Sequence, residues 1–218
     1  MQNIKVSGFS FLLLALGAFA GVATEFIWAY LVMPAIFGAS FDAWETVPAI
    51  VHWVITCITW GAVAFVLIKI AREKFHFDLF EKGAKPKLWQ WITVVVGVVL
   101  CMGLSYHNWN GFKVVKEFQN IGWLLFIFQY IYYAFEVVLF TLIIVFGQKA
   151  LETWFKKENF PYGGVLVGLT WGLAHIFSKD LHVGLFAAFV GFLYGTAYLL
   201  LNRDIKLTFL ILYLMFVL

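Results

Sequence analysis

Charged residues are scarce in this chain of 218 residues: Asp, Glu, Lys and Arg together make up 12% of it. Soluble domains use about 25% charged residues, so this composition excludes an ordinary soluble domain. Cysteine is also rare, and Cys57 and Cys101 form no CxxC pair, which argues against a disulfide framework or a zinc ribbon. We interpret both cysteines as small, buried hydrophobic residues.

Hydrophobic side chains replace the missing charge, at 63% of the sequence with a mean hydropathy of +0.91. Apolar runs of about 18 or more residues recur along the chain, and each could cross a hydrocarbon core of about 30 Å as a helix. The sequence therefore predicts an all-α, polytopic integral membrane bundle that forms one domain, residues 1–218. We expect seven membrane helices, at about residues 7–37, 47–70, 88–106, 121–147, 163–177, 183–201 and 206–218.

The first apolar run begins like a secretory signal peptide, with Lys5, a hydrophobic stretch from Phe9 and the triplet Ala18-Phe19-Ala20. The run continues to Phe37, however, which is too long for a signal core and long enough for a membrane span. We therefore expect this segment to remain uncleaved as the first membrane helix.

Basic residues are distributed unevenly among the connections that join these helices. Twelve of the 15 fall on one side of the predicted membrane and three on the other. The twelve are Lys5, Lys69, Arg72, Lys74, Lys82, Lys85, Lys87, Lys149, Lys156, Lys157, Arg203 and Lys206; the three are Lys113, Lys116 and Lys179. Cytoplasmic loops carry the excess of Lys and Arg, so the N-terminus is predicted to be cytoplasmic. The net charge of +3 thus reflects topology, and we expect the lipid bilayer of the cell membrane, not nucleic acid, as a partner.

Three ionisable residues lie where the chain otherwise predicts lipid-buried helix: Glu25, Glu136 and His175. A charge near the bilayer centre costs at least a few kcal/mol, so such a residue marks a functional site by default. At a rise of about 1.5 Å per residue, the three fall at similar depths and could share one site. An imidazole can exchange a proton with a buried carboxylate, as in a general base that activates water. Alternatively, each side chain only hydrogen-bonds to a neighbouring helix and fixes the packing.

Two short motifs surround this Glu/His pair: Glu136-Val-Val-Leu-Phe140-Thr-Leu and Trp171-Gly-Leu-Ala-His175. They resemble the CAAX protease and bacteriocin-processing (CPBP) family of membrane proteins, which includes the type II CAAX prenyl endopeptidases. That family carries a Glu-Glu-x-x-x-Arg motif in one helix and a Phe-x-x-x-His motif in the next. The resemblance covers about residues 120–206 and implies a catalytic pair, Glu136 and His175, supported by Phe140 and Trp171. Glu25 is a further candidate because of its depth.

The chain also departs from the family pattern. Val137 stands in place of the second Glu, Thr141 in place of the Arg, and no histidine follows His182, so the later His-x-x-x-Asn motif is missing. The family is taken to stabilise the oxyanion with that motif, usually the largest catalytic contribution. The resemblance therefore implies an altered or non-proteolytic member with a buried Glu/His site. If the chain is an enzyme, we expect a membrane endopeptidase or hydrolase acting on a membrane peptide or a lipidated substrate.

Two other functions remain open. Small transporters use intramembrane carboxylates to couple protons or to bind a cationic substrate. In a ligand-binding or partner-binding subunit, the same carboxylates would hold a ligand or a second membrane subunit. Glycines spaced four apart, at Gly17/Gly21, Gly168/Gly172 and Gly191/Gly195, predict close packing of helices in any of these cases.

The remaining histidines suggest a metal site without defining one. His52, His107 and His182 lie near predicted outer helix ends, where converging imidazoles could bind a metal ion. No two of them have ligand spacing on one helix. No cofactor is predicted.

Overall fold

Nearly the whole described chain is helical. The computed structural model describes residues 7–38, 40, 43–81 and 83–218, and these contain no strand, which confirms the all-α prediction. The elements in chain order are α1 (Gly8–Ile27), the π-helical segment η1 (Trp28–Val32), α2 (Met33–Phe37), α3 (Thr46–Phe75), α4 (Leu88–Trp109), α5 (Lys113–Phe155), α6 (Tyr162–Val167), the π-helical segment η3 (Gly168–Gly172), α7 (Leu173–Ser178), α8 (Leu181–Leu200) and α9 (Ile205–Val217).

Five of the described helices are long and apolar enough to cross a membrane. They are Gly8–Phe37, Thr46–Phe75, Leu88–Trp109, Lys113–Phe155 and Leu181–Leu200. Two shorter apolar helices, Tyr162–Phe177 and Ile205–Val217, coincide with the remaining two predicted segments. The apolar runs therefore locate the helices. One predicted segment differs substantially in length from the helix that it corresponds to.

That exception is α5, which spans 43 residues where the sequence predicts a helix over 121–147. Gly122 interrupts it with φ 73° and ψ 170°, a backbone conformation that glycine adopts far more readily than other residues. The predicted start at 121 thus falls at a bend inside the helix. Residues 113–120, which the sequence predicts to be a connection, are helical instead, because their polar side chains find partners within the protein, as described below.

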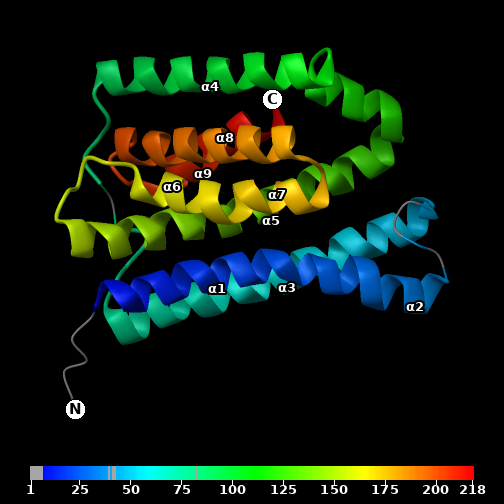
Figure 1. Ribbon diagram of the computed structural model, residues 1–218, viewed down its shortest axis with the longest axis horizontal. Helices are drawn as coiled ribbons and strands as arrows, with labels where there is room; N and C mark the ends of the chain where they lie inside the picture. Colours follow the sequence, from blue (N-terminus) through cyan, green and yellow to red (C-terminus); the bar gives the residue numbers. More distant parts are fainter. Residues whose placement is uncertain (1–6, 39, 41–42, 82) are drawn as a thin grey trace.

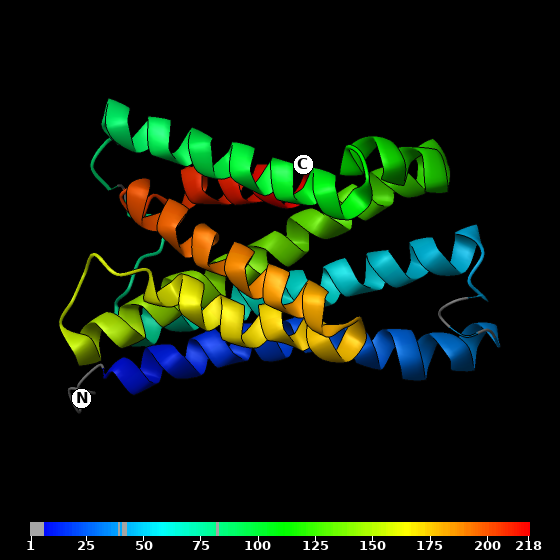
Figure 2. The same ribbon diagram turned by 45° about the horizontal axis from the view of Figure 1, so that its top comes forward.

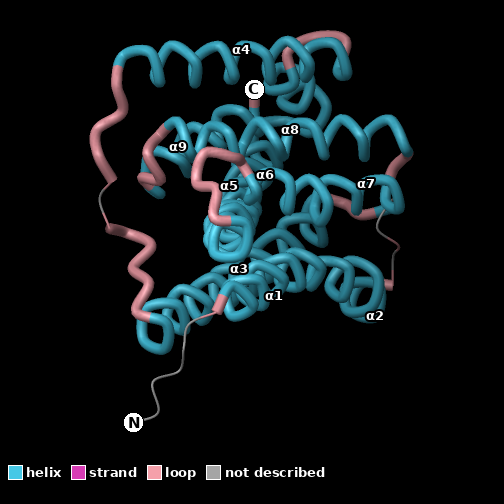
Figure 3. The backbone as a smooth tube through the Cα atoms, turned by 60° about the vertical axis from the view of Figure 1, so that its left-hand side comes forward, coloured by secondary structure: helices cyan, strands magenta, loops and turns pink. Residues whose placement is uncertain are grey.

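α5 is the central helix of the bundle (Figure 3). Its residues Val137 and 139–148 are all buried, as expected for a helix surrounded by others. α1 and α3 pack against one side of α5, and α6 and α9 pack against the other. α8 crosses this second group, and α4 lies over α8 and α9 (Figures 1 and 2).

Small residues let α8 approach the segment α6–η3 closely. A Cβ added at Gly172 would lie 2.7 Å from the Cα of Ala188, and one at Gly191 would lie 2.9 Å from the N of Gly168. Neither distance leaves room for a side chain. The prediction of close packing at Gly168/Gly172 and Gly191/Gly195 is confirmed.

The connections lie at two ends of the bundle (Figure 1). One end holds the start of α1 and the connections α3–α4, α5–α6 and α8–α9; the other holds α2–α3, α4–α5 and α7–α8. We call the first the basic end, because the described Lys and Arg residues belong to its segments, apart from Lys113, Lys116 and Lys179. Lys5 and Lys82 lie outside the described residues.

Candidate functional site

Glu25, near the end of α1, connects three helices. Its Oε1 accepts a 2.6 Å hydrogen bond from the hydroxyl of Tyr132 on α5 and lies 3.5 Å from the Nε2 of His52 on α3. The Glu25 side chain is 27% exposed, whereas that of His52 is 1% exposed. The His52 ring also contacts Trp44, with 4.9 Å between ring centroids. His52, considered above only as a metal ligand, is therefore a neighbour of Glu25, the first of the two carboxylates that the sequence places in apolar helices.

Two further polar residues, Thr56 and Trp60, continue from His52 along one face of α3. Residues four apart lie on the same side of a helix, and all three side chains are almost completely buried. The Trp60 ring contacts Tyr132, with 4.8 Å between centroids. Thr56 Oγ1 and Trp60 Nε1 have no hydrogen-bond partner among the described residues. We call Glu25, Tyr132 and these three residues of α3 the Glu25 cluster.

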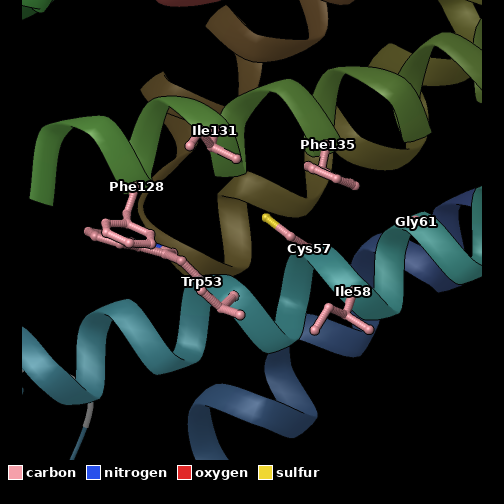
Figure 4. A pocket seen from close by; sticks show the side chains of 8 residues that line it. Trp53, Cys57, Ile58, Gly61, Phe128, Ile131 and Phe135 are labelled. Carbon is pink, nitrogen blue, oxygen red and sulfur yellow. The ribbon is translucent and has the colours of Figure 1, made fainter.

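An apolar cavity of about 310 Å³ borders the Glu25 cluster, between α3 and α5 (Figure 4). Its walls include Trp53, Cys57 and Gly61 from α3 and Phe128, Ile131 and Phe135 from α5. The ring centroid of Trp53 lies 6.4 Å from that of Tyr132, whose hydroxyl binds Glu25. An apolar space and a polar cluster therefore share two helices.

The second of these carboxylates, Glu136, follows Tyr132 by one turn of α5 and binds a residue of η3. Its Oε1 accepts a 2.8 Å hydrogen bond from Trp171 Nε1. His175 Nδ1 lies 2.9 Å from the carbonyl oxygen of Trp171. A carbonyl can only accept, so Nδ1 is the donor, and Nε2 of a neutral ring is left as a proton acceptor. Glu136 and His175 thus meet at Trp171, and no direct hydrogen bond or ion pair between these two described residues is present.

Phe140 packs beside this arrangement and is fully buried. Its ring centroid lies 5.3 Å from that of Trp171, which in turn lies 4.7 Å from that of His175. The structure therefore brings together Glu136, Phe140, Trp171 and His175, which the sequence singles out as one site. Glu25 joins them indirectly, because its partner Tyr132 and Glu136 are four residues apart on one face of α5.

Both carboxylates lie next to π-helical backbone. η1 begins three residues after Glu25, and η3 contains Trp171, the partner of Glu136. Single turns of π-helix inside α-helices are rare and occur frequently at functional sites. Neither segment is predicted from the sequence.

A second polar cluster lies around the Gly122 bend. Glu117, 4% exposed, accepts hydrogen bonds of 2.9 Å from the Tyr130 hydroxyl and 2.7 Å from the Tyr133 hydroxyl. Lys113 Nζ donates a 2.9 Å bond to the carbonyl of Phe216 and lies over the rings of Tyr133 and Phe216. We call these five residues the Glu117 cluster. Lys113 places a positive charge at the C-terminal end of α9, where the helix dipole favours a cation.

The three histidine metal candidates do not come together. His52 is buried on α3, whereas His107 on α4 and His182 on α8 are exposed. In the part of the chain that the structure describes, no group of three or more His, Cys, Asp or Glu residues is arranged to hold a metal ion.

Comparison with protein-family models, curated proteins and solved structures finds no match to this chain. The resemblance of residues 120–206 to the CPBP family therefore stays a prediction, and the function must be argued from the site itself.

Sequence reasoning missed three residues of the Glu25 cluster, Thr56, Trp60 and Tyr132, and all five residues of the Glu117 cluster, including Lys113 and Glu117. A signal existed for the first two, because they follow His52 at intervals of four in an apolar helix. Lys113 and Glu117 were assigned to a loop, where charge needs no explanation. Tyr132 carries no signal of its own in a segment rich in aromatic residues.

Proposed function

We propose that the protein is a multi-pass protein of the cell membrane with seven spans and a cytoplasmic N-terminus. The orientation is supported by the basic end, since cytoplasmic loops carry the excess of Lys and Arg. The seventh span is supported by Lys113: α9 has 13 residues, about 20 Å of helix, and the buried Lys113 binds a carbonyl of its last turn. A polar partner inside the protein lets a short helix end below the membrane surface.

Within this membrane protein, Glu25 and Glu136 exchange protons for small organic cations, which makes the chain a proton-coupled carrier. One observation carries this proposal: among the described residues, neither carboxylate has a Lys or Arg within ion-pair distance. A carboxylate inside a membrane needs a proton or a cation to neutralise it. If protons and organic cations compete for the same carboxylate oxygens, a proton gradient across the membrane drives the movement of the cation.

The surroundings of Glu25 suit such a competition. Tyr132 donates a hydrogen bond to the carboxylate and His52 lies beside it, so both side chains orient it. Trp53, which lines the cavity and lies beside Tyr132, offers an aromatic face, and such faces attract organic cations. The apolar cavity between α3 and α5 accommodates the hydrocarbon part of the substrate.

The test is uptake of labelled quaternary ammonium compounds, from tetramethylammonium to benzyltrimethylammonium, into proteoliposomes. These cations have no neutral form that could cross the bilayer unaided. An acidic interior is expected to drive uptake, and Glu25→Gln or Glu136→Gln to abolish it. Glu117→Gln is the matched control, because it neutralises a buried carboxylate of the other cluster and should leave uptake intact. Uptake that does not depend on the pH gradient, or that is unchanged in Glu25→Gln, would refute proton coupling.

A second candidate is supported by the position of Trp171 between Glu136 and His175. It is the function expected from the CPBP resemblance, in which this pair activates water against a membrane peptide or a lipidated substrate. The missing His-x-x-x-Asn motif favours an altered or non-proteolytic member that only binds such a substrate or a partner membrane subunit.

Cleavage of a farnesylated peptide by the purified protein distinguishes the two candidates. A hydrolase is expected to lose turnover in Glu136→Gln and His175→Gln and to keep it in Glu25→Gln. A carrier shows no turnover and needs Glu25. Cleavage that persists in Glu136→Gln would exclude the hydrolytic pair.

A further inference from the structure

A second cavity, of about 350 Å³, lies away from both carboxylates, between α3, α5, α9 and Phe80 of the α3–α4 connection. Its walls include Ile68, Phe80, Val138, Leu142 and Phe209. Thr141 also borders it, but its hydroxyl already donates a 2.6 Å hydrogen bond to the carbonyl of Val137. The interior is therefore suited to hydrocarbon. Lys206, in the first turn of α9, is the one charged residue among the described residues that line it.

The cavity lies toward the basic end of the bundle, because α9 begins at the α8–α9 connection there (Figure 1). Arg72 follows Ile68 by one turn on the same face of α3, closer to that end. Lys206 and Arg72 are exposed and form none of the ion pairs found among the described residues. Arg203, by contrast, is bound to Glu152 and to the carbonyl of Glu158.

Two acidic side chains near the cavity already accept hydrogen bonds from backbone N–H groups. Asp204 accepts hydrogen bonds from the backbone N–H groups of Lys206 and Leu207, and Asp78 accepts one from Phe80. Over residues 69–87 the sequence has six basic residues against three acidic ones, Glu73, Asp78 and Glu81. The entrance thus carries net positive charge above an apolar interior.

We propose that this cavity binds one acyl chain of an anionic phospholipid, whose phosphate lies between Lys206 and Arg72. The argument is charge complementarity: basic residues beside an apolar groove at the membrane surface suit an anionic head group attached to a hydrocarbon chain. When the lipid binds, its acyl chain moves from the hydrocarbon of the bilayer into the hydrocarbon-like cavity, so the acyl chain contributes little to selectivity between lipids. The head group therefore decides which lipid binds. The inference requires a membrane protein but not carrier activity.

The test is native mass spectrometry of protein released from nanodiscs with equal amounts of phosphatidylglycerol and phosphatidylcholine, both with oleoyl chains. Wild type is expected to retain phosphatidylglycerol in preference to phosphatidylcholine. Lys206→Gln should reduce the preference about fivefold, the equivalent of about 1 kcal/mol for one basic residue at the surface. Lys206→Arg should keep it, and Val138→Phe, which fills the cavity without changing charge, should release the retained lipid.

Lys157→Gln is the matched control, because Lys157 is an exposed basic residue at the same end and does not line the cavity. Equal retention of the two lipids by wild type would overturn the proposal. An equal loss in Lys157→Gln and Lys206→Gln would also overturn it, since it would indicate general attraction to the basic end. If Lys206→Gln does not purify as a monodisperse species, Lys206→Arg and Val138→Phe decide the question.

Discussion

The Glu25 cluster and the Glu117 cluster both use tyrosines of α5, but the polar groups of the two clusters differ in how completely they are hydrogen-bonded. Tyr130 and Tyr133 of α5 both donate to Glu117, and Lys113 binds the end of α9. Tyr132, between them in sequence, points to Glu25, beside two buried polar atoms, Thr56 Oγ1 and Trp60 Nε1, without partners in the described structure. Beside the Glu117 cluster there is one such atom in the described structure, Oε1 of Gln129, while Nε2 of the same side chain donates a hydrogen bond to the Tyr133 hydroxyl.

This difference separates structural from functional polarity in a membrane interior. A network whose members are satisfied by one another fixes helix positions and has little left to offer a ligand. A cluster with unused donors beside a partly exposed carboxylate is destabilising unless a proton, a ligand or water completes it. Mutations in the two clusters should therefore have different effects. Those in the Glu117 cluster should mainly lower the stability of the protein, and those in the Glu25 cluster should mainly lower its uptake activity.

The largest stability effect is expected from Glu117→Ala. It leaves two partly buried tyrosine hydroxyls without their acceptor, and we expect a loss of about 2–4 kcal/mol, since interhelical hydrogen bonds in membranes reach about 1.7 kcal/mol each. Glu25→Ala removes the acceptor of one hydroxyl, at a side chain that is partly exposed, and should cost about 1 kcal/mol. Unfolding by steric trapping in bicelles measures both. A Glu25 variant as unstable as the Glu117 variant would remove the distinction between the clusters.

Neighbouring tyrosines give a smaller and closer comparison. Tyr133→Phe removes a donor to Glu117 and an acceptor for Gln129, so we expect about 1–2 kcal/mol of destabilisation and unchanged uptake. Tyr132→Phe removes only the donor to Glu25 and should cost less than about 1 kcal/mol, but it should shift the pH dependence of uptake. The same unfolding and uptake assays apply. Equal stability losses with identical pH profiles would contradict the assignment.

Most of the fold follows from the sequence, because membrane helices are specified by length and hydropathy. All seven apolar runs correspond to helices, since the hydrocarbon core admits no other way to satisfy a lipid-exposed backbone. The bend at Gly122 and the helix before it do not follow. They depend on Lys113 and Glu117 finding partners from distant parts of the chain. From the sequence pattern alone, such charged residues between apolar runs are assigned to a loop.

The site is predicted less completely than the fold. Glu25, Glu136 and His175 stand out because charge is expensive in lipid. Their partners Tyr132 and Trp171 have aromatic rings like those of many other residues here, and only the structure indicates which hydroxyl or indole N–H reaches a carboxylate. Trp171 was selected from its motif and Tyr132 was not. Side-chain pairing across helices depends on helix rotation, which periodicity in a nearly uniformly apolar segment cannot determine.

The smallest effect, and the one that separates the clusters most sharply, is expected from Thr56→Val. The substitution keeps the shape of the side chain and removes a buried hydroxyl that has no partner among the described residues, so it should stabilise the protein by about 1 kcal/mol. Thr141→Val is the control, because the Thr141 hydroxyl is equally buried but bonded to the Val137 carbonyl, and its loss should be neutral or slightly destabilising. A hydroxyl retained at a cost in stability indicates a functional contribution, so Thr56→Val should also reduce uptake while Thr141→Val leaves it unchanged. Destabilisation by Thr56→Val would mean that the hydroxyl is satisfied in the membrane, and the Glu25 cluster would then be as structural as the Glu117 cluster.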